Sequence, residues 1–371
     1  MTDYSYIMEK ASHFCIDGEF NSSFVAESGH INTTHFVEYK DNGQYRRYVI
    51  QRINTNVFKR PIEVMENIEK ITDHIRAKIE AAGMDADRGV LRFVRAKDGT
   101  NYYIDDHGGF WRAYIMVENA RTYESAGSPR RFFKVGKAFG NFQMQLSDFP
   151  ASELHETIPD FHNTTKRFRD FEEAIRNDVR GRVKKVTEEI EFIRERANLY
   201  CPFIYNGIED GRFRVRVTHN DTKMDNIMID DETDEPVCVI DLDTVMPGSV
   251  LNDFGDAIRF GASSALEDET DLDRVYLRLD MFESFTRGFI EGMGGSLLPS
   301  EISALPMGAV ILTFETGMRF LTDYINGDVY FRVHREEHNL DRARCQLKLV
   351  DDMETKLNKM NKIVNSILDE K

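Results

Sequence analysis

The spacing of apolar residues changes character near residue 118, and this change constrains the fold more than any other feature. Before it, runs rich in β-branched and aromatic residues alternate with turn residues such as Asp41-Asn42-Gly43, which is typical of antiparallel strands. After it, apolar residues recur mainly at three- and four-residue steps, which is typical of helices. The sequence predicts an α+β fold with a small antiparallel-sheet lobe over residues 1–118 and a larger, mainly helical lobe over residues 119–371.

The first lobe is predicted to hold six strands and one helix. The strands are expected at residues 23–28, 34–40, 47–53, 90–94, 102–105 and 110–117. Asp98-Gly99 predicts a hairpin between the fourth and fifth of these strands. The helix begins at Pro61, a residue suited to a first helical turn, and runs over residues 61–82.

The second lobe is predicted to be helical on either side of a short β island at residues 213–242. We expect a helix over residues 135–146 and one long charged helix over residues 166–200, with an apolar stripe along its length. A final helix carries apolar residues from Val350 to Ile367 at four- and three-residue steps. That stripe is expected to pack on the body of the protein, and a dimeric coiled coil is the alternative, so the protein is a monomer or a homodimer.

Composition and charge exclude several classes of protein. The chain has 48 Lys plus Arg and 64 Asp plus Glu, for a net charge of −16, so we expect no nucleic-acid partner. No apolar run is long enough to span a bilayer, and the first residues do not resemble an export signal. The four cysteines have neither C-x-x-C nor zinc spacing. These features favour a cytoplasmic globular protein without a membrane partner.

The β island carries the strongest chemical signal. A β-branched run leads to Asp221, Asn226 follows five residues later, and a second apolar run ends at Asp241, 20 residues after Asp221. A hairpin would bring these three positions to one edge of a sheet. Phosphoryl transfer needs a carboxylate that orients the attacking hydroxyl, together with amide and carboxylate oxygens for Mg²⁺. We therefore predict Asp221 as the catalytic base and Asn226 and Asp241 as Mg²⁺ ligands.

Three neighbouring residues are predicted to support this site. His219 is expected to brace the loop. Asp243 follows Asp241 directly after an apolar run, where a buried strand ends. A polar hairpin whose acids are merely solvated would not explain acids at that position. Asp253-Phe254-Gly255 has the letters of a kinase metal motif but follows no apolar strand. We expect Asp253 or Asp256 to lie near a helix N-terminus and to bond the catalytic loop.

The motif H-x-D-x-x-x-x-N followed by I-D-x-D resembles that of the aminoglycoside and choline phosphotransferases. The stretches Gly29–Thr34, Ile240–Gly248, Arg259–Ala262, Gly317–Leu321 and Glu337–Leu340 are similar to those of bacterial N-acetylhexosamine 1-kinases. The resemblance covers nearly the whole chain. It implies a bilobal protein-kinase-like fold. It also implies transfer of the γ-phosphate of ATP to the C1 hydroxyl of N-acetylglucosamine or N-acetylgalactosamine.

The nucleotide site departs from the protein-kinase pattern. Only one glycine of a glycine-rich loop is present, and the usual strand lysine is replaced by Gln51 or Arg52, of which strand alternation lets only one face the nucleotide. A carboxylate on the helix, Glu69, is either the partner of that position or a solvated charge. An interlobe hinge at residues 115–119 would bond the adenine. The predicted nucleotide-binding residues are Gly29, Gln51, Arg52, Glu69, Val117 and Glu118.

A sugar site is predicted on the apolar segment 305–325. Glu315, Arg319 and Asp323 are spaced i, i+4, i+8 and share one helix face, where charges are costly unless they are paired or face a wet cavity. They form either a structural ion-pair ladder or a set of ligands for sugar hydroxyls. The resemblance favours Arg319 and Asp323 as ligands, with Asp221, His30 and Tyr330.

Two other functions remain open. The acceptor could be a different small alcohol, such as an inositol, a choline-like amine or an aminoglycoside. The missing strand lysine and the reduced glycine loop would also suit a nucleotide-binding pseudokinase. The intact set of Asp221, Asn226 and Asp241 argues against that reading.

Overall fold

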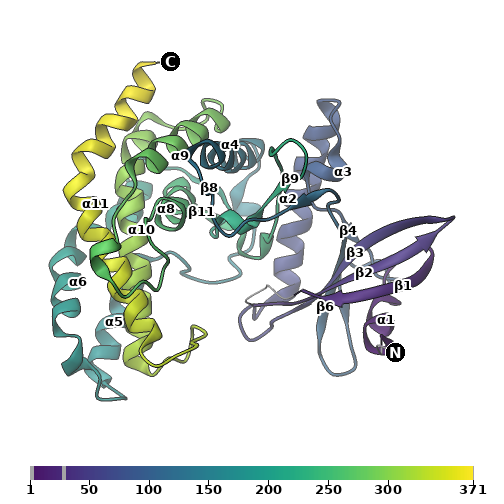
Figure 1. The fold of residues 1–371 in the computed structure, drawn as a ribbon, viewed down its shortest axis with the longest axis horizontal. Coiled ribbons are helices and arrows are strands. Elements are labelled where there is room, and N and C mark those ends of the chain that lie inside the picture. The colour runs from purple at the N-terminus through teal and green to yellow at the C-terminus, as the bar shows by residue number, and fades with distance from the viewer. Residues whose placement is uncertain (1–3, 27–30, 371) are drawn as a thin grey trace. The chain divides into compact units, whose positions relative to one another are not determined.

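Residues 4–26 and 31–370 are described by the computed structural model shown in Figure 1. The chain divides into two units. Unit 1 comprises Met1–Thr122, Asp148–Pro159 and Ile227–Met246, and unit 2 comprises Tyr123–Ser147, Asp160–Asn226 and Pro247–Lys371. The predicted α+β class is confirmed, because the N-terminal region is an antiparallel sheet and the C-terminal region is mainly helical.

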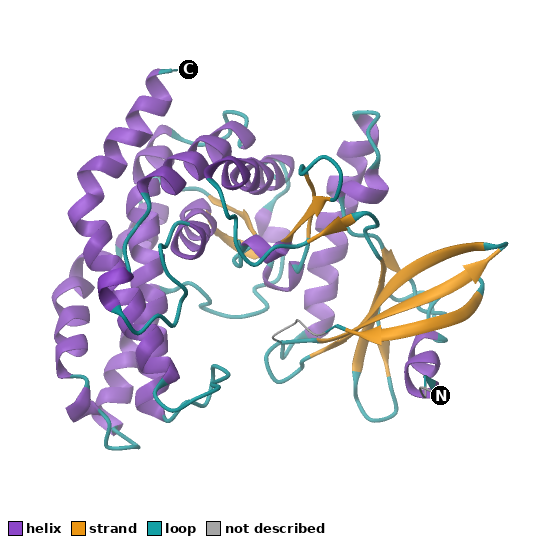
Figure 2. Cartoon of the chain, viewed as in Figure 1, coloured by secondary structure: helices purple, strands orange, loops and turns teal. Residues whose placement is uncertain are grey.

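Unit 1 is built on a six-stranded antiparallel sheet (Figures 1 and 2). Its path is β1-β2-β3-β6-β4, and β5 also pairs with β6. The strands are β1 (Glu19–Val25), β2 (Thr33–Asp41), β3 (Gln44–Ile53), β4 (Phe93–Val94), β5 (Tyr103–Ile104) and β6 (Phe110–Ile115). A smaller sheet in the same unit has the order β10-β9-β7, formed by β7 (Ala120–Arg121), β9 (Ile227–Asp230) and β10 (Pro236–Val239).

The two faces of the large sheet differ in chemistry. Strand alternation sends Tyr48, Ile50 and Trp111 into an apolar core that also contains side chains of α1 (Ser5–Ala11). The opposite face carries Gln51 and Arg112, which are also buried. Burying a polar pair costs free energy of folding unless its hydrogen bonds are satisfied. We therefore expect the polar side chains on this face to have a specific role.

The hairpin turn predicted at Asp98-Gly99 is present, since Ala96 and Thr100 are hydrogen-bonded across it, but the expected pairing of β4 with β5 is wrong. Gly99 does make a tight turn, with φ +91° and a hydrogen bond from its N–H to the carbonyl of Ala96. The two strands nevertheless pair with β6 and not with each other: Phe93 lies opposite Tyr114, and Tyr103 lies opposite Trp111. The reason is geometric. One edge of β6 is taken along its whole length by β3, so both short strands share the other edge.

Unit 2 is mainly helical, and most of the helices in Figure 2 belong to it. Its helices are α4 (Pro129–Gln145), α5 (Thr164–Asn177), α6 (Thr187–Tyr200), α7 (Phe203–Glu209), α8 (Val250–Gly261), α9 (Leu279–Gly292), α10 (Pro299–Asn326) and α11 (His338–Asp369). The other α-helices and strands are α2 (Pro61–Ala81) and α3 (Ala86–Gly89) in unit 1, β8 (Val215–Thr218) in unit 2, and β11 (Met246–Ser249). In the described ranges, no helix combines the length and apolar character needed to cross a membrane.

The single helix predicted over residues 166–200 is also wrong. It is two helices, α5 and α6, separated by a turn at which Asp178 adopts a left-handed conformation with φ +37°. The Asp178 carboxylate accepts the N–H of Val183, and its carbonyl accepts the N–H of Gly181. Val179, placed in the apolar stripe, is 62% exposed. The Asp178 side chain competes with the helix for local N–H groups, and Gly181 follows three residues later. The helix therefore ends here, although apolar spacing alone predicted that it would continue.

The last helix behaves as predicted. Val350, Met353, Met360, Val364 and Ile367 are buried inside unit 2, where α11 packs against α10 and α9. The stripe is therefore covered within one chain and does not need a coiled-coil partner.

Helices α4 and α9 approach so closely that glycine is required at their contact. A Cβ atom on Gly140 would lie 2.4 Å from the carbonyl oxygen of Phe289, and one on Gly288 would lie 2.0 Å from that of Phe133. The opposing atoms are backbone, so they cannot move aside as a side chain would.

We therefore predict that Gly288→Val lowers the stability of unit 2. Overpacking typically costs about 1–3 kcal/mol, and a backbone clash places this variant at or above the upper end. Thermal unfolding followed by circular dichroism measures the effect. Ser284→Val on the same helix controls for the helix propensity of valine, and equal melting temperatures for the two variants would contradict the prediction.

Candidate active site

The loop after β8 carries Asp221, and two acids of α8 hold its backbone. Asp253 lies in the first turn of α8 and accepts the N–H of His219 at 2.8 Å and that of Asn220 at 2.7 Å. Asp256, one residue after Gly255, accepts the N–H of Thr222 at 3.0 Å. Asn220 itself has φ +64°. These three N–H anchors, on the two residues before Asp221 and on the one after it, fix the direction in which Asp221 leaves the loop.

These acids are buried, so their ionisation depends on their partners. Burial raises the pKa of Asp253, although the two loop N–H groups and Gln143, which donates at 2.5 Å, favour its charged form. Burial also tends to raise the pKa of Asp256. The guanidinium of Arg259, at 2.8 Å, outweighs this effect and brings the pKa of Asp256 below its ordinary value. Asp253 also lies at the positive end of the α8 dipole.

The Asp-Phe-Gly sequence in α8 serves packing. Phe254 is fully buried and makes aromatic contacts with Phe282, Phe285 and Phe289 of α9. A Cβ on Gly255 would lie 2.5 Å from the carbonyl oxygen of Gly308 in α10. The tripeptide thus presses α8 against two other helices of unit 2, while its acid points back to the loop.

His219 is fully buried beside two aromatic rings. Its ring centroid lies 5.8 Å from that of Phe139 and 5.9 Å from that of Phe142, both edge-on. This arrangement holds the start of the loop against α4.

Asp221 is bound by two polar neighbours in unit 2. Asn226 donates through Nδ2 to the Asp221 carbonyl at 2.8 Å and to Oδ2 at 3.0 Å, and Lys223 Nζ lies 3.2 Å from Oδ2. The Asp221 side chain is 30% exposed. Since Nδ2 of Asn226 is used on Asp221, Oδ1 is the atom left for a cation. Lys223 was missed by sequence reasoning, and its signal was its position two residues after Asp221.

Asp241 belongs to unit 1, where it occupies a corner. Its φ is +58°, it is exposed, and the next two residues, Leu242 and Asp243, are buried. The Asp243 carboxylate forms an ion pair with Arg112 and accepts Nδ2 of Asn32 at 2.7 Å.

Strand alternation separates Gln51 from Arg52, the two residues at the predicted position of a kinase lysine. Gln51 is buried and Arg52 is exposed. Gln51 lies directly opposite Arg112 of β6 and accepts two of its N–H groups, at 2.8 and 2.5 Å. Burial disfavours the charge of Arg112, but Asp243 raises its pKa above the ordinary value. Sequence reasoning missed Arg112, although it is the only charged residue in the apolar run 110–117.

Glu69 of α2 has partners other than Gln51 or Arg52. Its carboxylate pairs with Arg95 and accepts Nδ2 of Asn101 at 3.0 Å. Gly29 and His30 lie outside the described residues.

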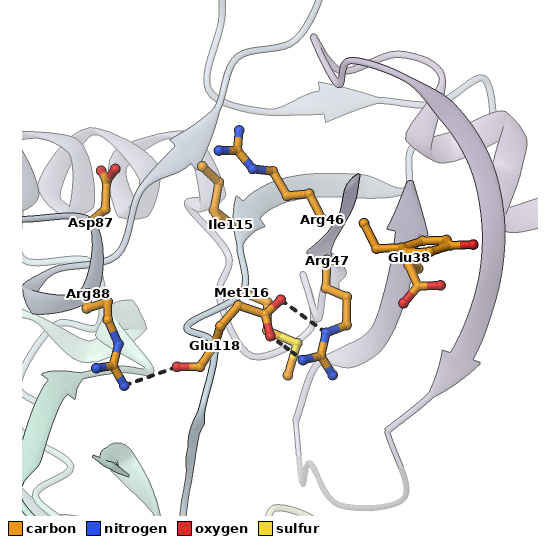
Figure 3. A pocket seen from close by; sticks show the side chains of 9 residues that line it. Glu38, Arg46, Arg47, Asp87, Arg88, Ile115, Met116 and Glu118 are labelled. Atoms are coloured by element: carbon orange, nitrogen blue, oxygen red, sulfur yellow. Dashed lines mark hydrogen bonds and ion pairs between the residues drawn. The ribbon is translucent and has the colours of Figure 1, made fainter. Parts of the chain in front are cut away.

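The predicted hinge borders a pocket of about 400 Å³ in unit 1 (Figure 3). In Figure 3 the Glu118 carboxylate meets the Arg47 guanidinium, and Arg88 reaches the Glu118 carbonyl, at 3.1 Å. Val117 is buried beside the pocket lining and does not contribute to it. The lining residues are Glu38, Tyr45, Arg46, Arg47, Asp87, Arg88, Ile115, Met116 and Glu118.

The three charged residues spaced along α10 do not pair with one another. Glu315 is fully buried and accepts bonds from His162 at 2.9 Å and Thr164 at 2.6 Å. The Arg319 guanidinium lies 5.4 Å from the Phe161 ring centroid and 5.6 Å from that of Phe331.

Asp323, the third charged residue, binds the segment that follows α10. Its Oδ1 accepts the N–H groups of Val329 and Tyr330, and its Oδ2 accepts those of Phe331 and the Asn339 side chain, each at 2.9 Å. Asp323 thereby holds the backbone of Tyr330, whose side chain is 61% exposed.

Comparison with known proteins identifies the family. Residues 25–282, more than half of the chain, match the family described as "Phosphotransferase enzyme family". The chain belongs to this family.

Solved structures share the fold of this phosphotransferase at low sequence identity. An aminoglycoside phosphotransferase from Alicyclobacillus acidocaldarius is 12% identical, with a TM-score of 0.61 over 97% of this chain and 96% of that one. A choline kinase from Cryptosporidium parvum is 13% identical, with a TM-score of 0.54 over 99% and 97%. A spectinomycin phosphotransferase in complex with ADP and spectinomycin is 11% identical, with a TM-score of 0.55 over 97% and 99%. The protein-kinase-like fold is confirmed.

Carboxylate and amide oxygens are the donors that Mg²⁺ typically takes from a protein. In the part of the chain that is described, no three His, Cys, Asp or Glu side chains cluster as metal ligands. Mg²⁺ needs no such cluster, since it typically takes one or two protein oxygens together with substrate phosphates and water. An Asn226 side chain whose amide nitrogen is already engaged suits that role.

The buried Glu315 predicts a pH dependence of stability. Burial opposes its charge, but His162 and Thr164 lower its pKa below the ordinary 4.5. A lowered pKa stabilises the folded state above about pH 4.5, and this stabilisation is lost as the pH falls through the folded-state pKa. Glu315→Gln is expected to cost about 3 kcal/mol at pH 7 and to flatten the loss of melting temperature as the pH falls below about 4.5. The exposed pair residue Glu283 supplies the control, Glu283→Gln, which should keep the wild-type profile. An unchanged slope for Glu315→Gln would refute the assignment.

Proposed function

We propose that this phosphotransferase is an ATP-dependent small-molecule kinase that phosphorylates the C1 hydroxyl of N-acetylglucosamine or N-acetylgalactosamine. The observation that carries the chemistry is the carboxylate of Asp221, held by Asn226 and Lys223 on a loop whose backbone is anchored to α8. The sugar assignment rests on the resemblance to N-acetylhexosamine 1-kinases and on the polar groups of α10.

In this proposal Asp221 orients the acceptor hydroxyl and takes its proton as the oxygen attacks the γ-phosphorus. Its partial exposure leaves an oxygen accessible to an alcohol. Lys223 adds a positive charge next to the base, where phosphate oxygens gain negative charge during transfer. Little covalent chemistry is required of the protein, so positioning and electrostatics account for the rate.

Asn226 and Asp241 would hold Mg²⁺, which when bound neutralises charge on the phosphates of the nucleotide. Asn226 would act through Oδ1. Asp241 is assigned from its place in the I-D-x-D motif and from its exposure at a corner whose neighbours are buried.

ATP as donor is supported by the solved spectinomycin phosphotransferase, which holds ADP together with its acceptor. We assign the adenine to the main chain of Val117 and Glu118, with Gly29 near the phosphates. Gln51 would act through Arg112, and Glu69 would support the sheet through Arg95 and Asn101.

The acceptor is proposed to be neutral. An aminoglycoside or a choline-like amine is positively charged and would need carboxylates that are not already hydrogen-bonded. The carboxylate oxygens of Glu315 and Asp323 accept hydrogen bonds from partners within unit 2. Arg319 between two aromatic rings and the exposed Tyr330 instead offer donors and an apolar face, which suit a sugar. His30 is proposed as a further ligand. In this scheme Asp323 acts through the Tyr330 loop.

The first test is Asp221→Asn. The variant keeps the shape and hydrogen bonds of the side chain but loses the base, so kcat should fall by about 10²–10⁴ while nucleotide affinity is retained. Rates come from a coupled ADP assay, and ADP affinity comes from calorimetry. Asp225→Asn, four residues along the same loop, is the matched control. Near-normal turnover of Asp221→Asn would remove the base assignment.

The second test is a panel of acceptors with ATP, read by ³¹P NMR of the product. Transfer to C1 of either N-acetylhexosamine is expected. Arg319→Gln should raise the acceptor KM about tenfold or more without changing the ATP KM, whereas Arg335→Gln, at an exposed pair, should leave both unchanged. Activity confined to a non-sugar alcohol would support the alternative acceptor class, and ATP binding without transfer to any acceptor would support a pseudokinase.

A further inference from the structure

A buried arginine in unit 1 is linked to the segment that carries Asp241. The side chain of Arg112 is 4% exposed and that of Asp243 is 2% exposed, and the two form an ion pair through Nη1 and Oδ1. The remaining N–H groups of Arg112 include two that converge on Oε1 of Gln51. Gln51 in turn donates to the Thr34 hydroxyl at 2.9 Å.

The other side of Asp243 is held as well. Its Oδ2 accepts Nδ2 of Asn32, whose own Oδ1 accepts the backbone N–H of Asn54 at 2.9 Å. Two residues further on, the carbonyl of Val245 accepts Nδ2 of Asn67 from α2 at 3.1 Å. The short turn Leu242–Thr244 is therefore fixed by contacts from Arg112 of β6 and from Asn32, the residue before β2, and α2 holds Val245 at its end.

Asp241 is the first residue outside this fixed turn. It adopts φ +58° and ψ +57°, a conformation that costs energy for a residue other than glycine, and it is exposed although the next two residues are buried. The anchored turn thus supplies the constraint that holds Asp241 in an unfavourable backbone conformation.

We propose that Arg112 is a positioning residue for phosphoryl transfer, which holds Asp243 and through it sets the direction in which Asp241 presents its carboxylate to Mg²⁺. This inference rests on the proposed function and adds a residue to it. The cation that protein kinases carry on the β3 strand is replaced here by a guanidinium on the neighbouring strand. That guanidinium acts on the metal-binding segment and not on the nucleotide.

Arginine is needed for this task because of its shape. One guanidinium reaches Gln51 and Asp243 simultaneously with N–H groups in fixed directions, which the single ammonium of lysine cannot reproduce. Groups that orient a metal ligand typically contribute about 10- to 100-fold to metal affinity or activity.

The experiment compares ADP binding in the presence of Mg²⁺ and in EDTA by calorimetry, so that it does not depend on turnover. Wild type should bind ADP more tightly with Mg²⁺. Arg112→Met should lose about tenfold or more of that enhancement while its affinity in EDTA stays within about twofold of wild type. Arg112→Lys should fall in between. Arg196→Met, which breaks a partly buried pair with Glu354 in unit 2, should keep the full enhancement.

A double variant separates positioning from a purely structural ion pair. Arg112→Met leaves the Asp243 charge buried without its arginine, so it is expected to melt at a lower temperature. In Arg112→Met/Asp243→Asn that charge is removed, and the melting temperature should recover substantially. The Mg²⁺ enhancement should remain lost. Recovery of both together, or an enhancement in Arg112→Met equal to that of wild type, would overturn the positioning role.

The same titrations distinguish this inference from the function on which it rests. A wild-type protein whose ADP affinity does not respond to Mg²⁺ would overturn both the proposed metal site and the role of Arg112. A wild-type response that survives in Arg112→Met would overturn the role of Arg112 alone.

Discussion

The hydrogen bonds from the loop at residues 219–222 to the first turns of α8 are the interaction on which the candidate site depends. Backbone N–H groups in a loop that runs into the protein must find acceptors, and Asp253 and Asp256 supply them. Because both acids sit on one rigid helix, they fix several loop residues with respect to one another. Asp221 therefore leaves a backbone whose conformation is set before any ligand binds, and the phosphoryl transfer proposed for this loop would use that preorganisation.

That helix is itself fixed by close packing. Gly255 brings α8 against α10, and Phe254 fills the aromatic cluster shared with α9. The α4–α9 contact depends on glycines in the same way. Closely packed interiors transmit displacements instead of absorbing them. Substitutions far from Asp221 are therefore expected to shift its position through α8.

Several buried charges in the described part of the chain are held by a partner side chain. Glu315 is bound by His162 and Thr164, Asp256 by Arg259, and Asp243 by Arg112. Replacing one partner in such a pair leaves an uncompensated charge, which is far more costly than the pair is favourable. These pairs consequently hold the conformation of the segments that carry them. Those segments are the 219–222 loop, α10 and the turn after Asp241.

The sequence by itself determined the α+β class, the bounds of α2 and of the strands of the large sheet to within a few residues, the buried stripe of α11, and the motif that contains Asp221, Asn226 and Asp241. Local patterns suffice for these features, because strand alternation, helical spacing and motif order are properties of neighbours along the chain. Only the tertiary structure decided that β4 and β5 share an edge of β6, and that Gln51 is bound by Arg112. It also decided that the α10 residues Glu315, Arg319 and Asp323 each bind a different partner. These outcomes depend on which donor lies across the sheet or on the next helix, and such neighbours, often more than 60 residues away along the chain, leave no periodic trace in the sequence.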